Sequence, residues 1–350
     1  MQFRGVHNRR LLMSTLVEHE GMQAAEEVLF SGCSAGALGL YMGIDDMADS
    51  VSSHPAVLAH KAQVQARSQT QPVPSIQFRG LADSGFFMNF NRTSDPDFKI
   101  NRKMVQRAGL GAEFQLAIAD TFALTNMAAG VPAPCLAYMR AASLPAYYCA
   151  YGEYLVNFVR TPVFLKQSQF DTWQNGNILR TFFPPGVNKF GQMLANAMLS
   201  TLVFRSNPAV DYALVDAVMG HRSVQGAATT PPHGLYIHSC SSHCSVCRAG
   251  GDQRVFTLHT INATSGRSGD ITEYTTQAAF DQWYKHKHTS VGGSVTLPTG
   301  RQLRKRGGDM AGDHPGVSPA ELLAFQQDSP HRVYVQNLSY PCSHCCRCIQ

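Results

Sequence analysis

Residues 32–36, Gly-Cys-Ser-Ala-Gly, form a G-x-S-x-G pentapeptide between two apolar stretches. The stretch at 28–30 is typical of a short buried strand, and the stretch at 35–47 is typical of a helix. A serine hydroxyl is a weak nucleophile until it is exposed and paired with a base, and a sharp strand-to-helix turn exposes it. We therefore predict that Ser34 is a nucleophile and that the N–H of Ala35 stabilises an oxyanion. An ordinary glycine turn is the alternative.

An acid and a histidine follow Ser34 in the chain order that a strand–elbow–helix nucleophile requires, which is Ser, then Asp or Glu, then His. Asp171 follows a predicted strand at 163–165, and His243 follows a predicted strand at 235–237. We expect His243 to take the proton of Ser34 and Asp171 to orient the imidazole.

The position of His243 does not by itself exclude the other histidines, of which the chain has 14 in all. His238 alternates with Tyr236 along the predicted strand, so we expect it to be packed. Surface positions are expected for His233, His259, His286 and His288.

The elements that must position these residues alternate between strand and helix. Further strands are expected at 75–78 and near 85–87, and a loop at 65–75. Helices are expected at 7–20, 103–129 and 188–205. Strands that alternate with helices predict an α/β class with a mostly parallel sheet flanked by helices.

Composition narrows the function classes. Charged residues are 15% and apolar residues 44% of 350 residues, which argues against a wholly disordered chain. The net charge of +5 is too small an excess to favour a nucleic-acid partner. The sequence has no run of 18 apolar residues, so we expect no membrane span, and the oligomeric state is not readable.

Ten cysteines, three of them at 240–247 and four at 342–348, suggest disulfides and an oxidising compartment. Glycosylation sequons at Asn91, Asn262 and Asn337 agree with this prediction. The first 22 residues contain no apolar segment of signal-peptide length, which conflicts with it. A zinc site built from two C-x-x-C pairs, at 244/247 and 342/345, is the alternative to disulfides.

The region after residue 290 has a different composition, rich in Gly, Pro, Asp and basic residues. We predict a domain at 1–290, a low-order insertion at 291–330, and a Cys-rich C-terminal segment at 331–350 that packs on the same domain. The basic run at 301–306 is interpreted as a solvated loop, with a nuclear localisation signal as the alternative.

Several blocks resemble, in order, the pectin acetylesterase/Notum family of secreted serine esterases. They are residues 29–36 around Ser34, Ala82-Asp83-Ser84-Gly85-Phe86-Phe87, Phe170-Asp171-Thr172-Trp173-Gln174, residues 236–244 around His243, and the closing segments 282–284 and 340–342. The resemblance covers most of residues 1–290 and the last ten residues.

This resemblance implies an α/β-hydrolase-like fold and a triad of Ser34, Asp171 and His243. It implies a carboxylic ester hydrolase that removes O-linked acyl groups, such as the acetyl ester of a polysaccharide, without cofactor or metal. A secreted or cell-wall location follows, as does a disulfide between Cys135 and Cys149. Cys240 or Cys244 would be tied to the C-terminal cluster that contains Cys342 and Cys345.

The chain also departs from the family pattern. The family's domain begins well before residue 1, so we expect the fold to be N-terminally incomplete and to lack the Gly-rich loop that supplies oxyanion donors. Ala37 stands where the family has a second glycine, and its methyl group is expected to crowd the turn. A non-catalytic or weakly active relic that binds a glycan or a protein partner is therefore the alternative to an active esterase.

Overall fold

The computed structural model describes residues 3–67, 73–90, 114–203, 205–220, 233–244, 254–255, 276–285, 333–335 and 347–348. Five parallel strands form its main sheet in the order β1-β2-β3-β4-β6. Their bounds are β1 Glu27–Cys33, β2 Gln77–Asp83, β3 Val163–Ser168, β4 Gly234–His238 and β6 Val333–Val335. The expected parallel α/β sheet is confirmed.

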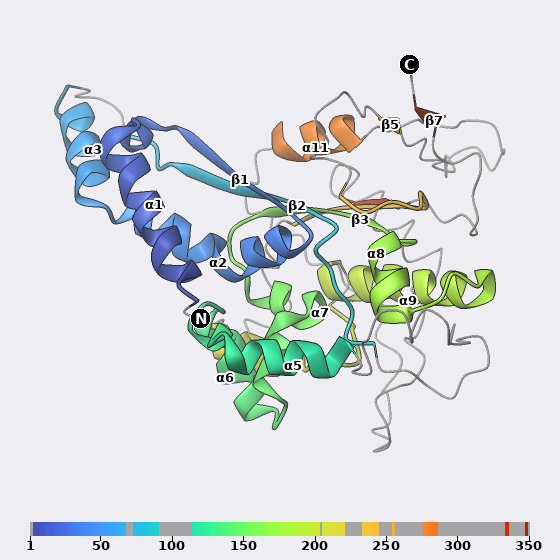
Figure 1. Ribbon diagram of the computed structural model, residues 1–350. Helices are drawn as coiled ribbons and strands as arrows, with labels where there is room; N and C mark the ends of the chain where they lie inside the picture. Colours follow the sequence, from blue (N-terminus) through green and yellow to red (C-terminus); the bar gives the residue numbers. More distant parts are fainter. Residues whose placement is uncertain are drawn as a thin grey trace.

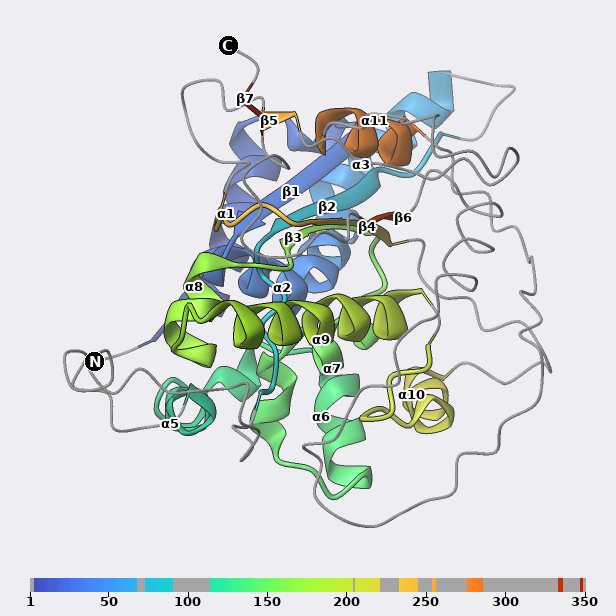
Figure 2. The same ribbon diagram turned by 90° about the vertical axis from the view of Figure 1, so that its right-hand side faces the viewer.

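Helices cover both faces of this sheet (Figures 1 and 2). On one face lies α11 (Thr276–Lys285), and on the other lie α2 (Ala35–Ser52) and α9 (Pro184–Leu202). Strands β3 and β4 are buried along their whole length because both of their faces are covered. At the edge formed by β1, exposed and half-buried residues alternate instead.

The remaining helices lie beside these layers. They are α1 (Gly5–His19), α3 (Pro55–Arg67), α5 (Phe114–Leu124), α6 (Ala133–Ala141), α7 (Gly152–Leu155), α8 (Thr172–Gln174) and α10 (Tyr212–Met219). Short 3₁₀ turns are η1 (Met22–Ala24), η2 (Met127–Ala129), η3 (Ala146–Ala150) and η4 (Val156–Phe158), and η5 (Asn175–Leu179) is a π-helical turn. A separate antiparallel pair joins β5 (Arg254–Val255) to β7 (Arg347–Cys348).

Local sequence explains the elements that carry the site. Helix α2 buries Leu40, Ile44 and Met47 at helical spacing against the sheet. Helix α9 begins at two prolines, which are favourable in the first helical turn. Asp171 caps α8, because its side chain accepts a hydrogen bond from the N–H of Gln174.

Expected and observed elements differ at their ends. Helix α3 reaches Arg67, so the expected loop begins later than residue 65, and β2 begins at Gln77 and continues to Asp83. The expected helix at 103–129 is described only from residue 114, where it divides into α5 and η2. The insertion expected at 291–330 lies outside the described residues.

Two disulfides join described residues, Cys135–Cys149 and Cys33–Cys244. The first pairing was expected. The prediction that Cys240 or Cys244 is bonded to the C-terminal cluster is wrong for Cys244, because Cys244 is bonded to Cys33 at the end of β1. This bond also removes Cys244 from the alternative zinc site. Cys240 is disulfide-bonded as well, but Cys342 and Cys345 lie outside the described residues, as do Asn91, Asn262 and Asn337.

Candidate active site

Ser34 occupies a strained turn between β1 and α2. Its φ of 56° and ψ of −123° are unusual for a residue with a side chain. The turn is tight enough to require glycine at 32, because a Cβ there would lie 2.3 Å from the carbonyl oxygen of Gly36. The N–H of Ser34 donates to the carbonyl of Asp83 at the end of β2, at 2.8 Å. The turn therefore holds the hydroxyl at the carboxyl edge of the sheet.

The methyl group of Ala37 was expected to crowd this turn. In the structure Ala37 is fully buried, and its methyl group has room. The space comes from Gly85, where an added Cβ would lie 2.3 Å from the Cβ of Ala37. The methyl group of Ala37 thus fills the space left open by the missing side chain of Gly85.

Asp171 lies three residues beyond the end of β3 and is completely buried. Its Oδ1 accepts from the N–H of Gln174 at 2.9 Å. Its Oδ2 accepts from Gln167 Nε2 at 3.0 Å and lies 2.8 Å from His243 Nδ1. Because Gln167 Oε1 accepts from the N–H of Phe86 at 3.2 Å, the amide group must turn its Nε2 towards the carboxylate.

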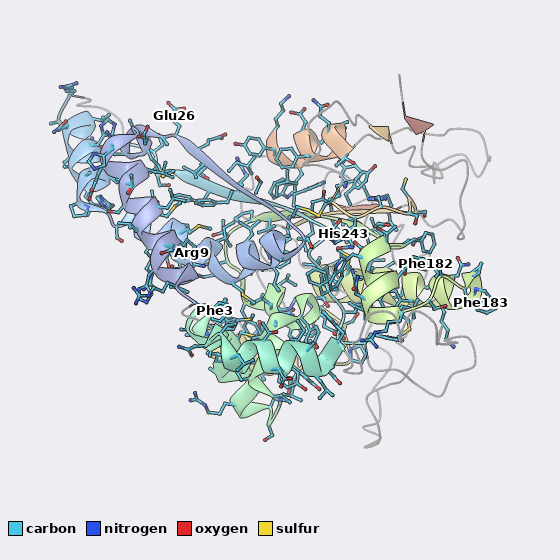
Figure 3. The ribbon with its side chains drawn as sticks, viewed as in Figure 1. Phe3, Arg9, Glu26, Phe182, Phe183 and His243 are labelled. Atoms are coloured by element: carbon cyan, nitrogen blue, oxygen red, sulfur yellow. A yellow bond between two sulfur atoms is a disulfide. The ribbon has the colours of Figure 1, made fainter. Side chains whose placement is uncertain are left out.

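His243 lies beyond the end of β4, and Figure 3 places it near the start of α2 and near α8. Its Nε2 is 2.8 Å from Ser34 Oγ. A carboxylate only accepts hydrogen bonds, so Asp171 favours the tautomer that carries its proton on Nδ1. Nε2 is then free to accept the proton of Ser34. The side chain of His243 is 16% exposed, so the pair borders solvent.

Hydrogen bonds join the acid segment to the histidine segment. Gln169 N–H donates to the carbonyl of His238 at 2.9 Å, and Gln169 Nε2 donates to Ser239 Oγ at 2.8 Å. The hydroxyl of Ser168 donates to the carbonyl of Cys240. These contacts extend the β3–β4 pairing beyond the strands and set the separation of Asp171 and His243.

Trp173 stacks on the imidazole of His243, with ring centroids 6.1 Å apart and planes 24° apart. The ring of Trp173 also packs against Phe87 and Phe114, with ring centroids 5.2 Å and 5.6 Å away. The imidazole of His243 is therefore in contact with the Trp173 ring as well as with Ser34 Oγ.

A buried ion pair lies next to the turn. Lys166 Nζ is 3.1 Å from Asp83 Oδ1, and both side chains are 2% exposed. The charge of Asp83 also affects Tyr41 on α2. The pKa of Tyr41 is raised well above its ordinary value, mainly by burial and to a smaller extent by Asp83, so this phenol stays neutral.

Sequence reasoning placed Ser34, Asp171 and His243, and the structure brings these three side chains together. The sequence analysis did not identify Cys33, Gln167 or Ser84 as neighbours of the site. Gln167 offered a weak signal, since it lies at the end of a buried strand four residues before Asp171. His238 is buried, as expected, but His233 is also buried: it accepts from the N–H of Val163 at 3.2 Å, so its predicted surface position is wrong.

The described residues contain no cluster of three or more His, Cys, Asp or Glu side chains suited to a metal ion. Within the same residues, no helix combines the length and the apolar character needed to cross a bilayer.

A parallel sheet with a sharp serine-bearing turn after one strand, and with an aspartate and a histidine after later strands, defines an α/β-hydrolase-like fold. The sequence model of the family described as pectinacetylesterase matches residues 1–302. The chain belongs to this family, which confirms the resemblance seen in the sequence.

Curated relatives include pectin acetylesterase 7 and pectin acetylesterase 11 of Arabidopsis thaliana, which are 26% and 24% identical over 247 residues. These matches cover 69% of this chain and 50% of each relative, so the chain spans about half the length of the curated relatives it matches. Among solved structures, the Wnt deacylase Notum from Drosophila is similar at 17% identity and a TM-score of 0.49, over 81% of this chain and 60% of that chain.

Proposed function

We propose that this chain carries the catalytic centre of a serine esterase that removes O-linked acyl groups through an acyl-enzyme. The observation that carries the proposal is the continuous hydrogen-bonded series from Asp171 through His243 to Ser34, with both contacts to the imidazole at 2.8 Å. Membership of the pectinacetylesterase family supports an acetyl ester of a polysaccharide such as pectin as the substrate.

In the first half-reaction, Ser34 Oγ attacks the acyl carbonyl carbon while His243 Nε2 takes the hydroxyl proton. The carbonyl π electrons move to oxygen, and the N–H of Ala35 at the start of α2 donates to this oxyanion. The intermediate then collapses: the bond to the alcohol oxygen breaks, and His243 returns the proton to that oxygen.

In the second half-reaction, water replaces the alcohol. His243 takes a proton from the water as its oxygen attacks the acyl carbon, and the second tetrahedral intermediate expels Ser34. The proton returns to Ser34, and the carboxylic acid leaves. Asp171 accepts from Nδ1 throughout and stabilises the imidazolium that forms in both steps.

A location in an oxidising compartment, outside the cell or in the cell wall, is part of this proposal. Its support is the pair of disulfides Cys33–Cys244 and Cys135–Cys149, because such bonds persist mainly in secreted proteins.

The test compares the wild-type chain with Ser34→Ala on p-nitrophenyl acetate and on acetylated pectin, and follows labelling by a fluorophosphonate probe. We expect release of p-nitrophenol and of acetate, with both lost in Ser34→Ala, and probe attachment at Ser34 by peptide mass spectrometry. Hydrolysis that is unchanged in Ser34→Ala would exclude Ser34 as the nucleophile. A folded wild-type chain that is neither active nor labelled would favour a binding protein without turnover.

A further inference from the structure

The disulfide Cys33–Cys244 joins the two residues that adjoin the proposed nucleophile and the proposed base. Cys33 immediately precedes Ser34, and Cys244 immediately follows His243. The bond spans 211 residues of sequence and holds the two Cα atoms 5.6 Å apart. A covalent link therefore runs alongside the hydrogen bond between Ser34 and His243.

Ser84 holds the same segment from a second direction. Its Oγ accepts from the N–H of Cys244 at 3.1 Å. Its hydroxyl proton is directed to Asp83 Oδ1, 2.9 Å away, which leaves a lone pair facing Cys244. Asp83 is in turn fixed by Lys166, and the N–H of Ser84 donates to the carbonyl of Lys166 at 2.8 Å.

The backbone at these positions is constrained. Ser34, Ser84 and Cys244 have φ values of 56°, 57° and 56°, a region that non-glycine residues rarely occupy. Such conformations are unfavourable and persist only where surrounding contacts over-determine them. Cys244 is joined by the disulfide to Cys33, which precedes Ser34, and by a hydrogen bond to Ser84.

We propose that Cys33, Cys244 and Ser84 form a clamp that sets the distance between His243 Nε2 and Ser34 Oγ, which makes them positioning residues for catalysis. This proposal rests on the proposed function. A bridge that only stabilises the fold would change the unfolding temperature but not kcat. The clamp predicts a change in kcat at temperatures where the protein is fully folded.

The main experiment compares Cys33→Ala/Cys244→Ala with Cys135→Ala/Cys149→Ala, which removes the disulfide in the buried cluster around α6 and η3. We expect the first variant to lose about 10²-fold in kcat on p-nitrophenyl acetate and in fluorophosphonate labelling rate, because small displacements of reacting groups have effects of that size. Its KM should change less than about twofold. The second variant should lose thermal stability and keep kcat. A folded Cys33→Ala/Cys244→Ala variant with wild-type kcat would overturn the proposal.

Ser84 provides a test that leaves the disulfide intact. Ser84→Ala and Ser84→Gly both remove the hydroxyl, but glycine also relieves the positive φ. If the hydroxyl positions Cys244, both variants lose kcat to a similar extent, by about tenfold, although the glycine variant is the more stable of the two. Recovery of kcat in Ser84→Gly alone would show that fold stability, and not the hydroxyl, is responsible, and would overturn the role of Ser84.

Hydrogen exchange separates failure of the clamp from failure of the proposed function. Amides of residues 239–244 should exchange faster in Cys33→Ala/Cys244→Ala than in the wild type, whether or not the chain hydrolyses esters. A wild type without Ser34-dependent turnover would overturn the proposed function, and faster exchange in the same preparation would still support the clamp. Unchanged exchange at residues 239–244 would overturn the clamp.

Discussion

His243 Nε2 lies 2.8 Å from Ser34 Oγ, although 209 residues separate the two in sequence. Both residues follow parallel strands whose carboxyl ends lie along one edge of the sheet, with β2 and β3 between them. The segment after β4 crosses that edge to reach Ser34, and it is hydrogen-bonded on the way to Thr172 beyond β3 and to Ser84 beyond β2. Removal of a single group should therefore change the rate more than it changes the fold.

Asp171→Asn should lower kcat about 10³–10⁴-fold, as the loss of an orienting carboxylate does in serine hydrolases. The amide favours the imidazole tautomer with its proton on Nε2, which can no longer accept from Ser34. The Oδ1 of asparagine can still accept from the N–H of Gln174, so the cap of α8 is retained. Its Nδ2 faces the Nε2 donor of Gln167, so the variant should also lose some stability. Steady-state kinetics on p-nitrophenyl acetate and thermal unfolding check both parts. Wild-type kcat in this variant would remove Asp171 from the mechanism.

Gln167→Met should lower both kcat and stability. The change removes the donor to Asp171 Oδ2 and leaves the buried N–H of Phe86 without its acceptor. An orphaned buried donor costs about 1–3 kcal/mol, and we expect kcat to fall about tenfold because the carboxylate loses one of its restraints.

Gln174→Met is the matched control for this prediction. The side chain of Gln174 accepts from the N–H of Met88 and donates to the carbonyl of Phe86, whereas only its backbone N–H is bonded to Asp171. It should therefore lose stability in urea unfolding to a similar extent while kcat stays near the wild-type value. Equal losses of kcat in the two variants would contradict a specific role for Gln167.

The sheet could be predicted because strands β1, β3 and β4 each contain an apolar run of three residues. The pentapeptide around Ser34, and the chain order in which Asp171 and His243 follow it, predicted the candidate site. The ends of the strands could not be predicted, since Lys166, Gln167 and Ser168 are polar yet fully buried. Their burial depends on partners such as Asp83 for Lys166 and Cys240 for Ser168, which are distant in sequence.

The partner of Cys244 was missed for a related reason. The family resemblance favoured a link of Cys240 or Cys244 to the C-terminal cluster, whereas Cys33 is isolated in the sequence. Cys33 and Cys244 meet because the segment after β4 crosses the carboxyl ends of β3 and β2 and reaches the end of β1. Spacing along the chain carries no information about that approach.

Gly85→Ala should destabilise the fold by about 1–3 kcal/mol, because the new methyl group would meet the Cβ of Ala37 at 2.3 Å. Ala37→Gly in the same chain should recover part of this loss by removing that contact. The recovery should be incomplete, since the backbone of Ala37 and Leu38 also lies 3.2 Å from the added atom. A double-mutant cycle in urea measures the coupling. Strictly additive free energies of unfolding would show that the two sites do not compete for this space.

Glu153→Gln should stabilise the protein at neutral pH. Glu153 on α7 is 3% exposed, and burial raises the pKa of its carboxyl from 4.5 to about 7, against the opposing hydrogen bonds from Asn89 and Asn207. The folded state therefore binds a proton more tightly than the unfolded state does. The stability from this proton is complete below about pH 4.5 and is lost as pH rises through about 7. A shift of this size corresponds to about 3 kcal/mol.

Urea unfolding between pH 4.5 and pH 8 tests this prediction, because glutamine keeps an acceptor for the N–H of Asn89, which donates to Glu153 Oε1 at 2.7 Å. The wild type should lose stability relative to Glu153→Gln across this range, and the two should converge at the acidic end. Glu26→Gln is the control, since Glu26 is exposed at the far end of the molecule from His243 (Figure 3) and should leave the pH slope unchanged. Parallel stability curves for the wild type and Glu153→Gln would mean that Glu153 stays ionised in the folded protein, and that its hydrogen bonds outweigh the cost of burial.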